Sequence, residues 1–478
     1  MSTAREKLVE ELARIVGPKS VISDRHQLMA YECDGYTIQR GLPAAVVFPA
    51  DTDQVAAVVK YLHREKIPFV PRGAGTGLSG GAIPLHGEVV VNLVRMNRIL
   101  HIDYENRYAV VQPGVVNRRL SQVVGARGYY YAPDPSSQQA CTLGGNIGEN
   151  AGGPHCLKYG VTTNHVLALE WVLPDGQVVM VGGPNGDDVG YDLRGLFIGT
   201  EGTLGIVTRI WVRLLKKQVG VKTILALFDR VEDASRAVSG IIAKGILPGA
   251  LEMMDRLAMR AVEAGAYPVG YPEDIEAVLL LELDGSAEGL EDQAEDAVKV
   301  CKEHGVRDVR VAASEPERTL WWNNRKTAFG AMGNISPDYL VQDGVIPRST
   351  LPEVLARIAE ISKDSGLRIA NVFHAGDGNL HPLVLFDSGV PGETQRAVET
   401  GSRVLQVCAD VGGSITGEHG VGLEKMYDME KIFSPADIEY QLKIRGIWNA
   451  EELCNPGKLF PRPAKCIDAK AMAAAGRG

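Results

Sequence analysis

The sequence has seven cysteines among 478 residues, and no two of them form a Cys-x-x-Cys pair. Iron–sulfur clusters and disulfide-stapled small domains need several thiols at close, regular spacings. The scattered thiols therefore exclude a cluster of that kind and favour reduced cysteines in a cytoplasmic protein. If the protein handles electrons, a carrier other than an iron–sulfur cluster must hold them.

Long apolar runs and excess positive charge are also lacking. No apolar run is long enough to span a bilayer, and the first residues are charged and helix-forming rather than a hydrophobic signal segment. The formal net charge is -9, so no general basic surface exists for nucleic acid or anionic lipid. We expect a cytoplasmic protein without an intrinsic membrane segment, in which any membrane association comes through partner subunits.

Length and local pattern predict more than one folded unit. A chain of 478 residues is too long for one ordinary core, so roughly two to four domains are expected. Residues 4–16 have the apolar spacing of an amphipathic helix, and no period is clear from there to about residue 40. Short elements then alternate, with strands at 44–48, 68–70 and 166–173 and a helix at 52–65.

Residues 71–81 read Pro-Arg-Gly-Ala-Gly-Thr-Gly-Leu-Ser-Gly-Gly and follow a predicted strand. Glycine at this density lets backbone N–H groups line a concavity that binds phosphate. The spacing Gly75-x-Gly77-x-x-Gly80 matches a dinucleotide fingerprint, but Pro84 and a strand-like run at 88–93 stand where a helix should follow. The alternative for this loop alone is a structural turn.

Two further glycine-rich stretches lie beside predicted strands. Residues 132–153 run from Ala-Pro-Asp-Pro-Ser-Ser to Asn-Ala-Gly-Gly, and residues 199–208 read Gly-Thr-Glu-Gly-Thr-Leu-Gly-Ile-Val-Thr. Three separated glycine loops suit a large flat cofactor laid along the chain, with backbone groups touching its phosphates and ring edge.

Residues 372–381, Val-Phe-His-Ala-Gly-Asp-Gly-Asn-Leu-His, place a glycine-broken turn between two apolar runs. Read as a hairpin, they bring His374 and His381 to the turn end of paired strands. Residues 412–420 add Glu418 on a stretch too rich in glycine to be helical. Two histidines and one glutamate can hold a divalent ion and leave positions open for substrate. The alternative is a polar hairpin with surface histidines.

The composition shifts after about residue 215. Strands at 221–228, 250–254 and 277–283 alternate with helices at 231–244 and 287–304, which predicts a ferredoxin-like α+β domain built on an antiparallel sheet. A further helix at 319–332 carries Trp321 and Trp322, which we expect to be packing residues.

Residues 40–216 resemble the FAD-binding domain of the vanillyl-alcohol oxidase and p-cresol methylhydroxylase (PCMH) family, on the three glycine-rich motifs quoted above. The chain to about Pro461 is similar to the catalytic flavoprotein subunits of bacterial glycolate oxidases (glycolate dehydrogenases). The motifs that carry this second likeness are 372–382, 412–422 and Asn455-Pro-Gly-Lys458. D-lactate and D-2-hydroxyglutarate dehydrogenases share most of them.

The resemblance implies an α+β, two-domain flavoprotein, with a PCMH-type FAD-binding domain and a ferredoxin-like α+β cap that carries substrate and metal. The expected divisions are a helical segment at 1–40, the FAD-binding domain at 41–217, the FAD-linked oxidase C-terminal domain at 218–461 and a tail at 462–478.

The resemblance also implies FAD as cofactor. The residues expected to bind it are Pro71, Arg72, Gly73, Ala74, Gly75, Thr76, Gly77, Ser79, Gly80, Pro133, Asp134, Ser136, Ser137, Gly144, Gly145, Asn146, Asn150, Gly152, Gly153, Glu201, Gly202, Gly205 and Ile206. Some members of the wider family attach flavin covalently to a histidine, and His155 lies in the matching region. The glycolate oxidase group holds FAD non-covalently, and we expect the same here.

A 2-hydroxy acid could chelate a zinc, manganese or iron ion held by His374, His381 and Glu418. His419 is the expected general base, with the flavin as hydride acceptor. Asn379 is expected to bind substrate or flavin, and Asp377 to fix the turn by an Asx-type bond. The expected partner of the substrate carboxylate is a guanidinium or ammonium group, first Arg325 and otherwise Lys326 or Arg348.

The expected reaction is oxidation of glycolate or D-lactate to the 2-oxo acid. Val341 and Gln342 stand where enzymes of D-2-hydroxyglutarate need a basic group, and Phe329 is apolar, which favours a small monocarboxylate. The resembled system passes electrons to a second flavin-domain subunit and an iron–sulfur subunit. The alternatives are a D-lactate dehydrogenase linked to cytochrome or quinone, a D-2-hydroxyglutarate dehydrogenase, a nicotinamide-dependent dehydrogenase, and a non-catalytic flavoprotein subunit.

Overall fold

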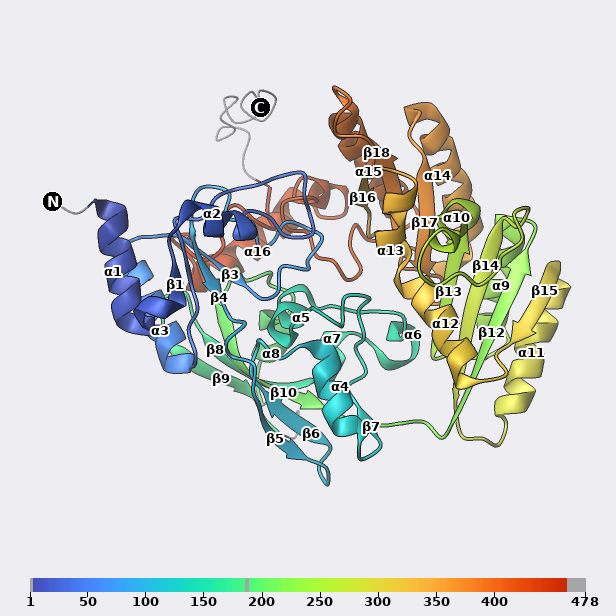
Figure 1. Ribbon diagram of the computed structural model, residues 1–478, viewed down its shortest axis with the longest axis horizontal. Helices are drawn as coiled ribbons and strands as arrows, with labels where there is room; N and C mark the ends of the chain where they lie inside the picture. The colour runs from blue at the N-terminus through green and yellow to red at the C-terminus, as the bar shows by residue number, and fades with distance from the viewer. Residues whose placement is uncertain (1–2, 185–188, 462–478) are drawn as a thin grey trace.

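The computed structural model describes residues 3–184 and 189–461. It forms two lobes that lie side by side (Figure 1). The first lobe holds the chain up to about residue 216 together with the last described residues, and the second is built around a seven-stranded sheet. None of the helices in the described ranges is long and apolar enough to cross a membrane.

The first lobe opens with α1 (Ala4–Val16), which confirms the predicted N-terminal helix. The Thr3 hydroxyl accepts the N–H of Glu6, and the Glu6 carboxylate accepts the N–H of Thr3, which closes a capping box. A four-stranded sheet follows in the order β1-β2-β4-β3, flanked by α2 and α3. Its elements are β1 (Val21–Ile22), α2 (Arg25–Leu28), β2 (Ala45–Val47), α3 (Thr52–Arg64), β3 (Phe69–Arg72) and β4 (Val89–Asn92).

The loop between β3 and β4 confirms that the glycine fingerprint is not a dinucleotide-binding turn. Residues 73–88 contain no helix, and β3 pairs in parallel with β4. Gly75 has φ 73°, and a Cβ there would lie 2.2 Å from Nη2 of Arg72, so this turn requires glycine.

The second sheet of the first lobe is antiparallel, in the order β5-β6-β10-β8-β9. Its strands are β5 (Ile99–Asp103), β6 (Tyr108–Val111), β8 (Val166–Val172), β9 (Val178–Gly182) and β10 (Ile206–Arg213). The neighbouring short elements are α4 (Asn117–Gly125), β7 (Tyr129–Tyr130), α6 (Cys156–Tyr159), α7 (Thr162–His165), α8 (Leu193–Phe197) and β11 (Leu215–Lys216).

The expectation of a loop around Gly144–Asn146 is wrong. Residues Leu143–Glu149 form the helix α5. Its glycines allow close packing, since a Cβ on Gly144 would lie 2.6 Å from Cβ of Pro113. Asn150, with φ 54° and ψ 46°, ends the helix in the left-handed conformation. A glycine-rich sequence was therefore a sign of close packing here rather than of an irregular chain.

The second lobe confirms the ferredoxin-like prediction. Its antiparallel sheet has the order β15-β12-β14-β13-β17-β18-β16, and the first four strands with α9 and α11 make the βαββαβ unit. The strands are β12 (Gly220–Phe228), β13 (Ala250–Asp255), β14 (Ala277–Gly285), β15 (Val306–Val311), β16 (Asp338–Val341), β17 (Ile369–His374) and β18 (Pro382–Phe386).

Helices cover both faces of this sheet, so its strands bury side chains on both sides. Along β14, Leu279 and Leu281 face one apolar cluster, while Val278 and Leu280 face another. One face carries α9 (Val231–Ala243), α11 (Leu290–Glu303), α14 (Leu351–Ser365) and α15 (Glu393–Asp410). The other carries α10 (Arg256–Glu263), α12 (Glu315–Lys326) and α13 (Ala328–Ala331).

The predicted helix at 319–332 is interrupted. It divides at Thr327 into α12 and α13, followed by a 3-10 turn at Met332–Asn334. Trp321 and Trp322 are buried on α12 at 3% and 7% exposure, which confirms their expected packing role.

The chain returns to the first lobe after the second. Beyond α16 (Pro435–Trp448), the Phe69 N–H donates to the Leu453 carbonyl (2.8 Å) and the Asn455 N–H donates to the Phe69 carbonyl (2.8 Å). The Asn455 amide also donates to the carbonyls of Gly81 (2.9 Å) and Glu201 (2.6 Å). The Asn455 motif therefore ties the last described residues to the glycine loops. The tail expected at 462–478 lies outside the described residues.

Candidate active site

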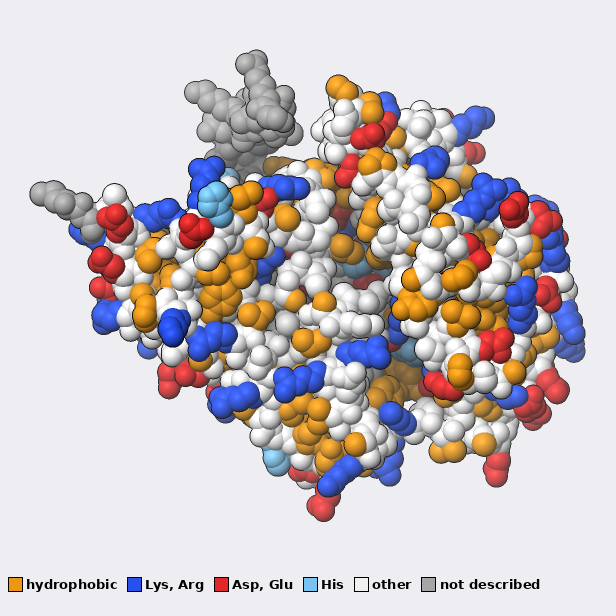
Figure 2. Space-filling view, in the orientation of Figure 1, with side chains coloured by type: hydrophobic (Ala, Val, Ile, Leu, Met, Phe, Trp, Pro, Cys, Tyr) orange, Lys and Arg blue, Asp and Glu red, His pale blue; other side chains and the backbone are white. Residues whose placement is uncertain are grey.

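A cavity lies between the lobes, and the space-filling view shows histidine side chains within the hollow (Figure 2). The glycine loop after β3, helix α5 and the start of β10 form its first-lobe wall. The residues predicted to bind cofactor that line it are Pro71, Arg72, Gly73, Ala74, Gly75, Thr76, Gly77, Ser136, Ser137, Gly144, Gly145, Asn146, Glu201, Gly202, Gly205 and Ile206.

Seven residues of the predicted set do not line this cavity: Ser79, Gly80, Pro133, Asp134, Asn150, Gly152 and Gly153. The Ser79 carbonyl accepts the N–H of Leu423, the Pro133 carbonyl accepts the Asn117 amide, and the Asn150 side chain accepts the N–H of Thr163. Their observed contacts shape the wall. Asp34, Glu149 and Trp171 also line the cavity and were missed, because no local motif marks them.

The wall fits a large planar cofactor such as FAD, because glycines on it leave open space in the cavity where a side chain would otherwise stand. A Cβ on Gly148 would meet no atom within 4 Å, and one on Gly145 would have its nearest neighbour, Thr142 Oγ1, at 3.5 Å. A Cβ at either position would therefore fit without a steric clash, on residues that line the cavity. Glycine there keeps the cofactor space open.

Replacing Gly145 by Leu tests this fit. Helix α5 should tolerate the side chain, since glycine is a poor helix former, but the side chain would occupy the cavity. We expect FAD affinity to fall by about a hundredfold, the scale of a few kcal/mol of overpacking. Titration of apoprotein with FAD measures it. The control is Gly446→Leu on the exposed surface of α16, where a Cβ also meets nothing. Equal FAD affinity in both variants would contradict the assignment of this wall.

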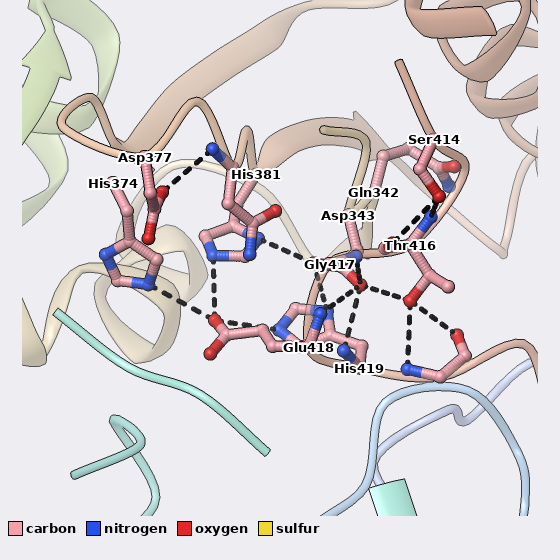
Figure 3. Close-up of polar contacts among 12 residues, drawn as sticks. Gln342, Asp343, His374, Asp377, His381, Ser414, Thr416, Gly417, Glu418 and His419 are labelled. Atoms are coloured by element: carbon pink, nitrogen blue, oxygen red, sulfur yellow. Dashed lines mark hydrogen bonds and ion pairs between the residues drawn. The ribbon is translucent and has the colours of Figure 1, made fainter. Parts of the chain in front are cut away.

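The predicted metal ligands lie together on the second-lobe side (Figure 3), where His381 and Glu418 line the cavity and His374 contacts Glu418. The hairpin of β17 and β18 forms as predicted, with His374 and Asn379 bridged across its turn. Oε1 of Glu418 lies 3.2 Å from Nε2 of His374 and 3.1 Å from Nε2 of His381. The two imidazole rings are 5.0 Å apart and perpendicular. The structure therefore gathers these three side chains at one point.

The pKa values of these side chains depend strongly on one another. Burial alone would raise the pKa of Glu418, but the imidazoles of His374 and His381 hold it well below its usual range. Burial would likewise lower the pKa of His374, whereas Glu252 and Glu418 raise it well above the usual value. Convergent nitrogen and carboxylate donors of this kind can hold a divalent cation.

Asp343 orders the loop that carries Glu418. Its Oδ2 accepts the Thr416 hydroxyl (2.5 Å) and the N–H groups of Gly417 (2.9 Å), Glu418 (3.1 Å) and His419 (2.8 Å). Its Oδ1 lies 3.6 Å from Nδ1 of His381. Asp343, His381, Glu418 and His419 present donor atoms all within 4.8 Å of one another. Asp343 was not predicted as a site residue.

His419 stacks on His381, with ring centres 4.7 Å apart, and lines the cavity. Its Nε2 lies 3.8 Å from Oε1 of Glu418. Burial lowers the pKa of His419 to about 4 despite the opposing charge of Asp343. The imidazole is therefore neutral near pH 7, with one ring nitrogen unprotonated.

The predicted carboxylate-binding cations differ in position. Arg325 and Lys326 line the cavity, with Arg325 Nη2 2.6 Å from Oε2 of Glu252 and Lys326 Nζ 3.1 Å from Oδ2 of Asp134. Arg348 does not line the cavity, and its guanidinium donates to the Gly376 carbonyl (3.0 Å). Glu252 was also missed by sequence analysis.

The turn residues of the hairpin also lie off the cavity wall. Asn379 packs against Gly417, and its N–H donates to Oδ1 of Asp377 (3.0 Å), which confirms the expected Asx-type bond. Val341 is buried in an apolar cluster, and the Gln342 amide donates to Glu424 (3.0 Å). Only Phe329 of the predicted specificity positions lines the cavity.

His155 lies between the lobes. Its Nδ1 is 3.0 Å from Asp134 and its Nε2 is 3.4 Å from Glu282 on β14, while its ring stacks on Trp322 at 5.6 Å. The guanidinium of Arg318 pairs with both oxygens of Glu282 (2.9 Å each). Burial alone would lower the pKa of His155, but Asp134 and Glu282 raise it to about 10.

This cluster predicts a pH dependence of stability. The folded-state pKa of His155 is above its unfolded value of about 6.5, so its contribution is complete below that pH and is lost as the pH rises through about 10. Replacing His155 by Phe keeps a ring against Trp322 and removes both carboxylate contacts. We expect a loss of about 1–3 kcal/mol at neutral pH, shrinking towards pH 10. Denaturant midpoints of both proteins from pH 6 to pH 10 measure it, and a difference independent of pH would contradict it.

Comparison with solved structures identifies the class first. The chain is similar to p-cresol methylhydroxylase with substrate bound, with a TM-score of 0.81 at 19% identity over 96% of this chain and 97% of that one. The α+β fold is therefore that of two-domain, PCMH-type flavoproteins, as predicted. Residues 43–182 match the model of an FAD binding domain, so the predicted cofactor FAD is supported.

Residues 218–459 match the C-terminal domain of FAD linked oxidases. The chain is 46% identical to "Glycolate oxidase subunit GlcD" of Escherichia coli K12, over 98% of this chain and 94% of that protein. It is 34% identical to a D-lactate dehydrogenase of Anaerostipes hadrus (87% of this chain, 89% of the relative) and 33% identical to a D-2-hydroxyglutarate dehydrogenase of Stutzerimonas stutzeri (95% and 98%). The protein belongs to the FAD-linked oxidases and is an oxidoreductase.

Proposed function

We propose that this flavoenzyme oxidises a small 2-hydroxy acid, glycolate or D-lactate, to the 2-oxo acid. The observation that carries the proposal is the convergence of His374 and His381 on Glu418, with His419 beside them. His381, Glu418 and His419 line the same cavity as the glycine loops. The 46% identity to a glycolate oxidase subunit supports the substrate class.

Each residue has a distinct proposed task. The Arg325 guanidinium binds the substrate carboxylate, which directs the hydroxyl towards the histidine cluster. The neutral imidazole of His419 takes the hydroxyl proton. FAD, when bound, accepts the hydride from the carbinol carbon. The backbone of the glycine loops and of α5 holds the cofactor at the first-lobe wall.

The donor set fits a divalent ion. Nε2 of His374 and of His381 face Oε1 of Glu418, and Glu252 contacts Nδ1 of His374 from behind. We propose these three residues as ligands of zinc, manganese or iron. A bound ion would act as a Lewis acid that lowers the pKa of the substrate hydroxyl.

The proposed preference for a small substrate rests on Phe329. Its ring stands edge-on to His381 at 5.6 Å and lines the cavity, whereas Val341 and Gln342 do not. An apolar ring at this position offers nothing to a second carboxylate. Turnover of D-2-hydroxyglutarate above that of glycolate would contradict this preference.

An anaerobic visible spectrum tests the whole proposal. The purified protein would be titrated separately with glycolate, D-lactate, L-lactate and D-2-hydroxyglutarate, before and after treatment with a chelator. We expect glycolate or D-lactate to bleach the flavin band, and the chelator to abolish bleaching. A band that none of these acids bleaches would reject the substrate class, and bleaching unaffected by metal removal would reject the metal.

The domain boundaries, the attachment of FAD, the location and the electron-transfer partners are also proposals. We propose the domain boundaries given above, non-covalent FAD, a cytoplasmic location, and transfer of electrons to a second flavin-domain subunit and an iron–sulfur subunit. A relative named as a subunit supports the last of these. Acid precipitation tests the attachment, since covalently bound flavin would remain in the protein pellet.

A further inference from the structure

The carboxylate of Glu252 contacts two groups with different proposed tasks. Its oxygens lie 2.8 and 2.9 Å from Nδ1 of His374, a proposed metal ligand. Its Oε2 also lies 2.6 Å from Nη2 of Arg325, the proposed partner of the substrate carboxylate. Glu252 is completely buried, at 0% exposure, so water does not screen these contacts.

The fold sets this arrangement through rigid elements. Strand β13 pairs with β17 in a register that places Glu252 directly opposite His374. Arg325 comes from the last turn of α12, which packs on the same face of the sheet, and is 2% exposed. Neither contact depends on a surface loop. The distance between the imidazole and the guanidinium is therefore built into the sheet and the helix that covers it.

The chemistry of the carboxylate gives these contacts a consequence. In the neutral imidazole that a metal would bind, donation from Nδ1 of His374 to Glu252 leaves Nε2 unprotonated; this nitrogen is directed at Glu418, 3.2 Å away. The same carboxylate restrains the guanidinium of Arg325 at the cavity wall. The Glu252 carboxylate therefore holds His374 in position for a metal ion and Arg325 in position for the substrate carboxylate.

We infer that Glu252 is a positioning residue that couples the two halves of substrate recognition, so that binding of the divalent ion and binding of the substrate carboxylate strengthen each other. The inference rests on the proposed function. Such coupling is reciprocal: the factor by which metal tightens carboxylate binding equals the factor by which the carboxylate tightens metal binding. A purely structural role, neutralising Arg325 in the interior, would lower stability when lost but would leave this factor unchanged.

The test measures that factor in FAD-loaded protein. Oxalate is the probe, a two-carbon dianion that can chelate metal and contact a guanidinium but has no hydride to donate. Its dissociation constant is read from the change in the flavin spectrum, with and without zinc, manganese or iron(II). Metal affinity is measured by competition with a chromophoric chelator. The variant is Glu252→Gln. The control is Asp255→Asn, a half-buried carboxylate at the end of the same strand that caps α10 and binds Asn371.

We expect metal to tighten oxalate binding at least about tenfold in the wild type and in Asp255→Asn. In Glu252→Gln, metal affinity should fall by about 10–100-fold, and the coupling factor should fall clearly below the wild-type value, to the part that oxalate gains by binding the ion directly. A coupling factor that stays at the wild-type value would overturn the inference. If Glu252→Gln loses FAD, Arg325→Lys replaces it, because it leaves the Glu252–His374 contact intact and should also reduce the factor. An unchanged factor there would equally overturn it.

The outcomes separate this inference from the function on which it rests. A wild-type protein that binds none of zinc, manganese and iron(II), or in which metal does not affect oxalate, would reject the proposed metal-assisted function. A wild-type protein with strong coupling that Glu252→Gln leaves intact would reject only the role of Glu252.

Discussion

Replacing Glu418 by Gln is expected to abolish oxidation of the 2-hydroxy acid while leaving FAD bound. Oε1 of Glu418 is the atom at which His374 and His381 converge, at 3.2 and 3.1 Å. The amide has nearly the same size but no charge, so a divalent ion would lose its carboxylate ligand. A Lewis acid contributes several kcal/mol to stabilising developing charge. The loss therefore corresponds to about a thousandfold or more in the rate of flavin reduction.

Two measurements make this prediction specific. Metal content by elemental analysis should fall with the rate, and the flavin absorbance per protein should stay at the wild-type value. The matched control is Glu170→Gln: Glu170 is a partly buried glutamate on β8 that accepts the hydroxyls of Thr52 and Thr208, away from the cavity. Glu418→Gln with wild-type flavin reduction would remove the carboxylate from the mechanism and leave His374 and His381 as ordinary buried histidines.

Local sequence was informative wherever one short segment carries both the turn and the chemistry. The hairpin from His374 to His381 and the glycine loop from Gly73 to Gly77 could be predicted, because glycine and apolar periodicity act over a few residues. That Glu418 joins this hairpin was suggested by the residue types and the glycine-rich stretch around it, and then by the family resemblance. No propensity specifies that residues 37 or more positions apart share one cavity.

The residues that sequence analysis missed act through tertiary contacts. Glu252 lies in a strand whose composition reads as core, and its role appears only from the register of β13 with β17. Asp343 follows a buried strand, and only the folded loop places three N–H groups around its Oδ2. The opposite error occurred at α5, where glycines that allow close packing looked like a loop. In each case a distant neighbour, rather than local preference, decides the role.

Replacing His419 by Ala is expected to slow flavin reduction by about a hundredfold or more, the usual loss on removing a general base. The neutral imidazole lines the cavity, stacks on His381 at 4.7 Å, and has its Nε2 3.8 Å from Oε1 of Glu418. That distance is longer than those of His374 and His381 to the same oxygen. His419 therefore stands beside the proposed ligand set, where it can accept the hydroxyl proton.

Single-turnover bleaching of the flavin under anaerobic conditions, with glycolate or D-lactate, measures this step directly. FAD and metal content should match the wild type, which distinguishes a base from a ligand. If His419→Ala loses metal together with activity, His419 is a fourth ligand, as its donor distance to Asp343 and Glu418 would also allow. Reduction at the wild-type rate would exclude both roles, and the proton would then have to leave through another group on the cavity wall.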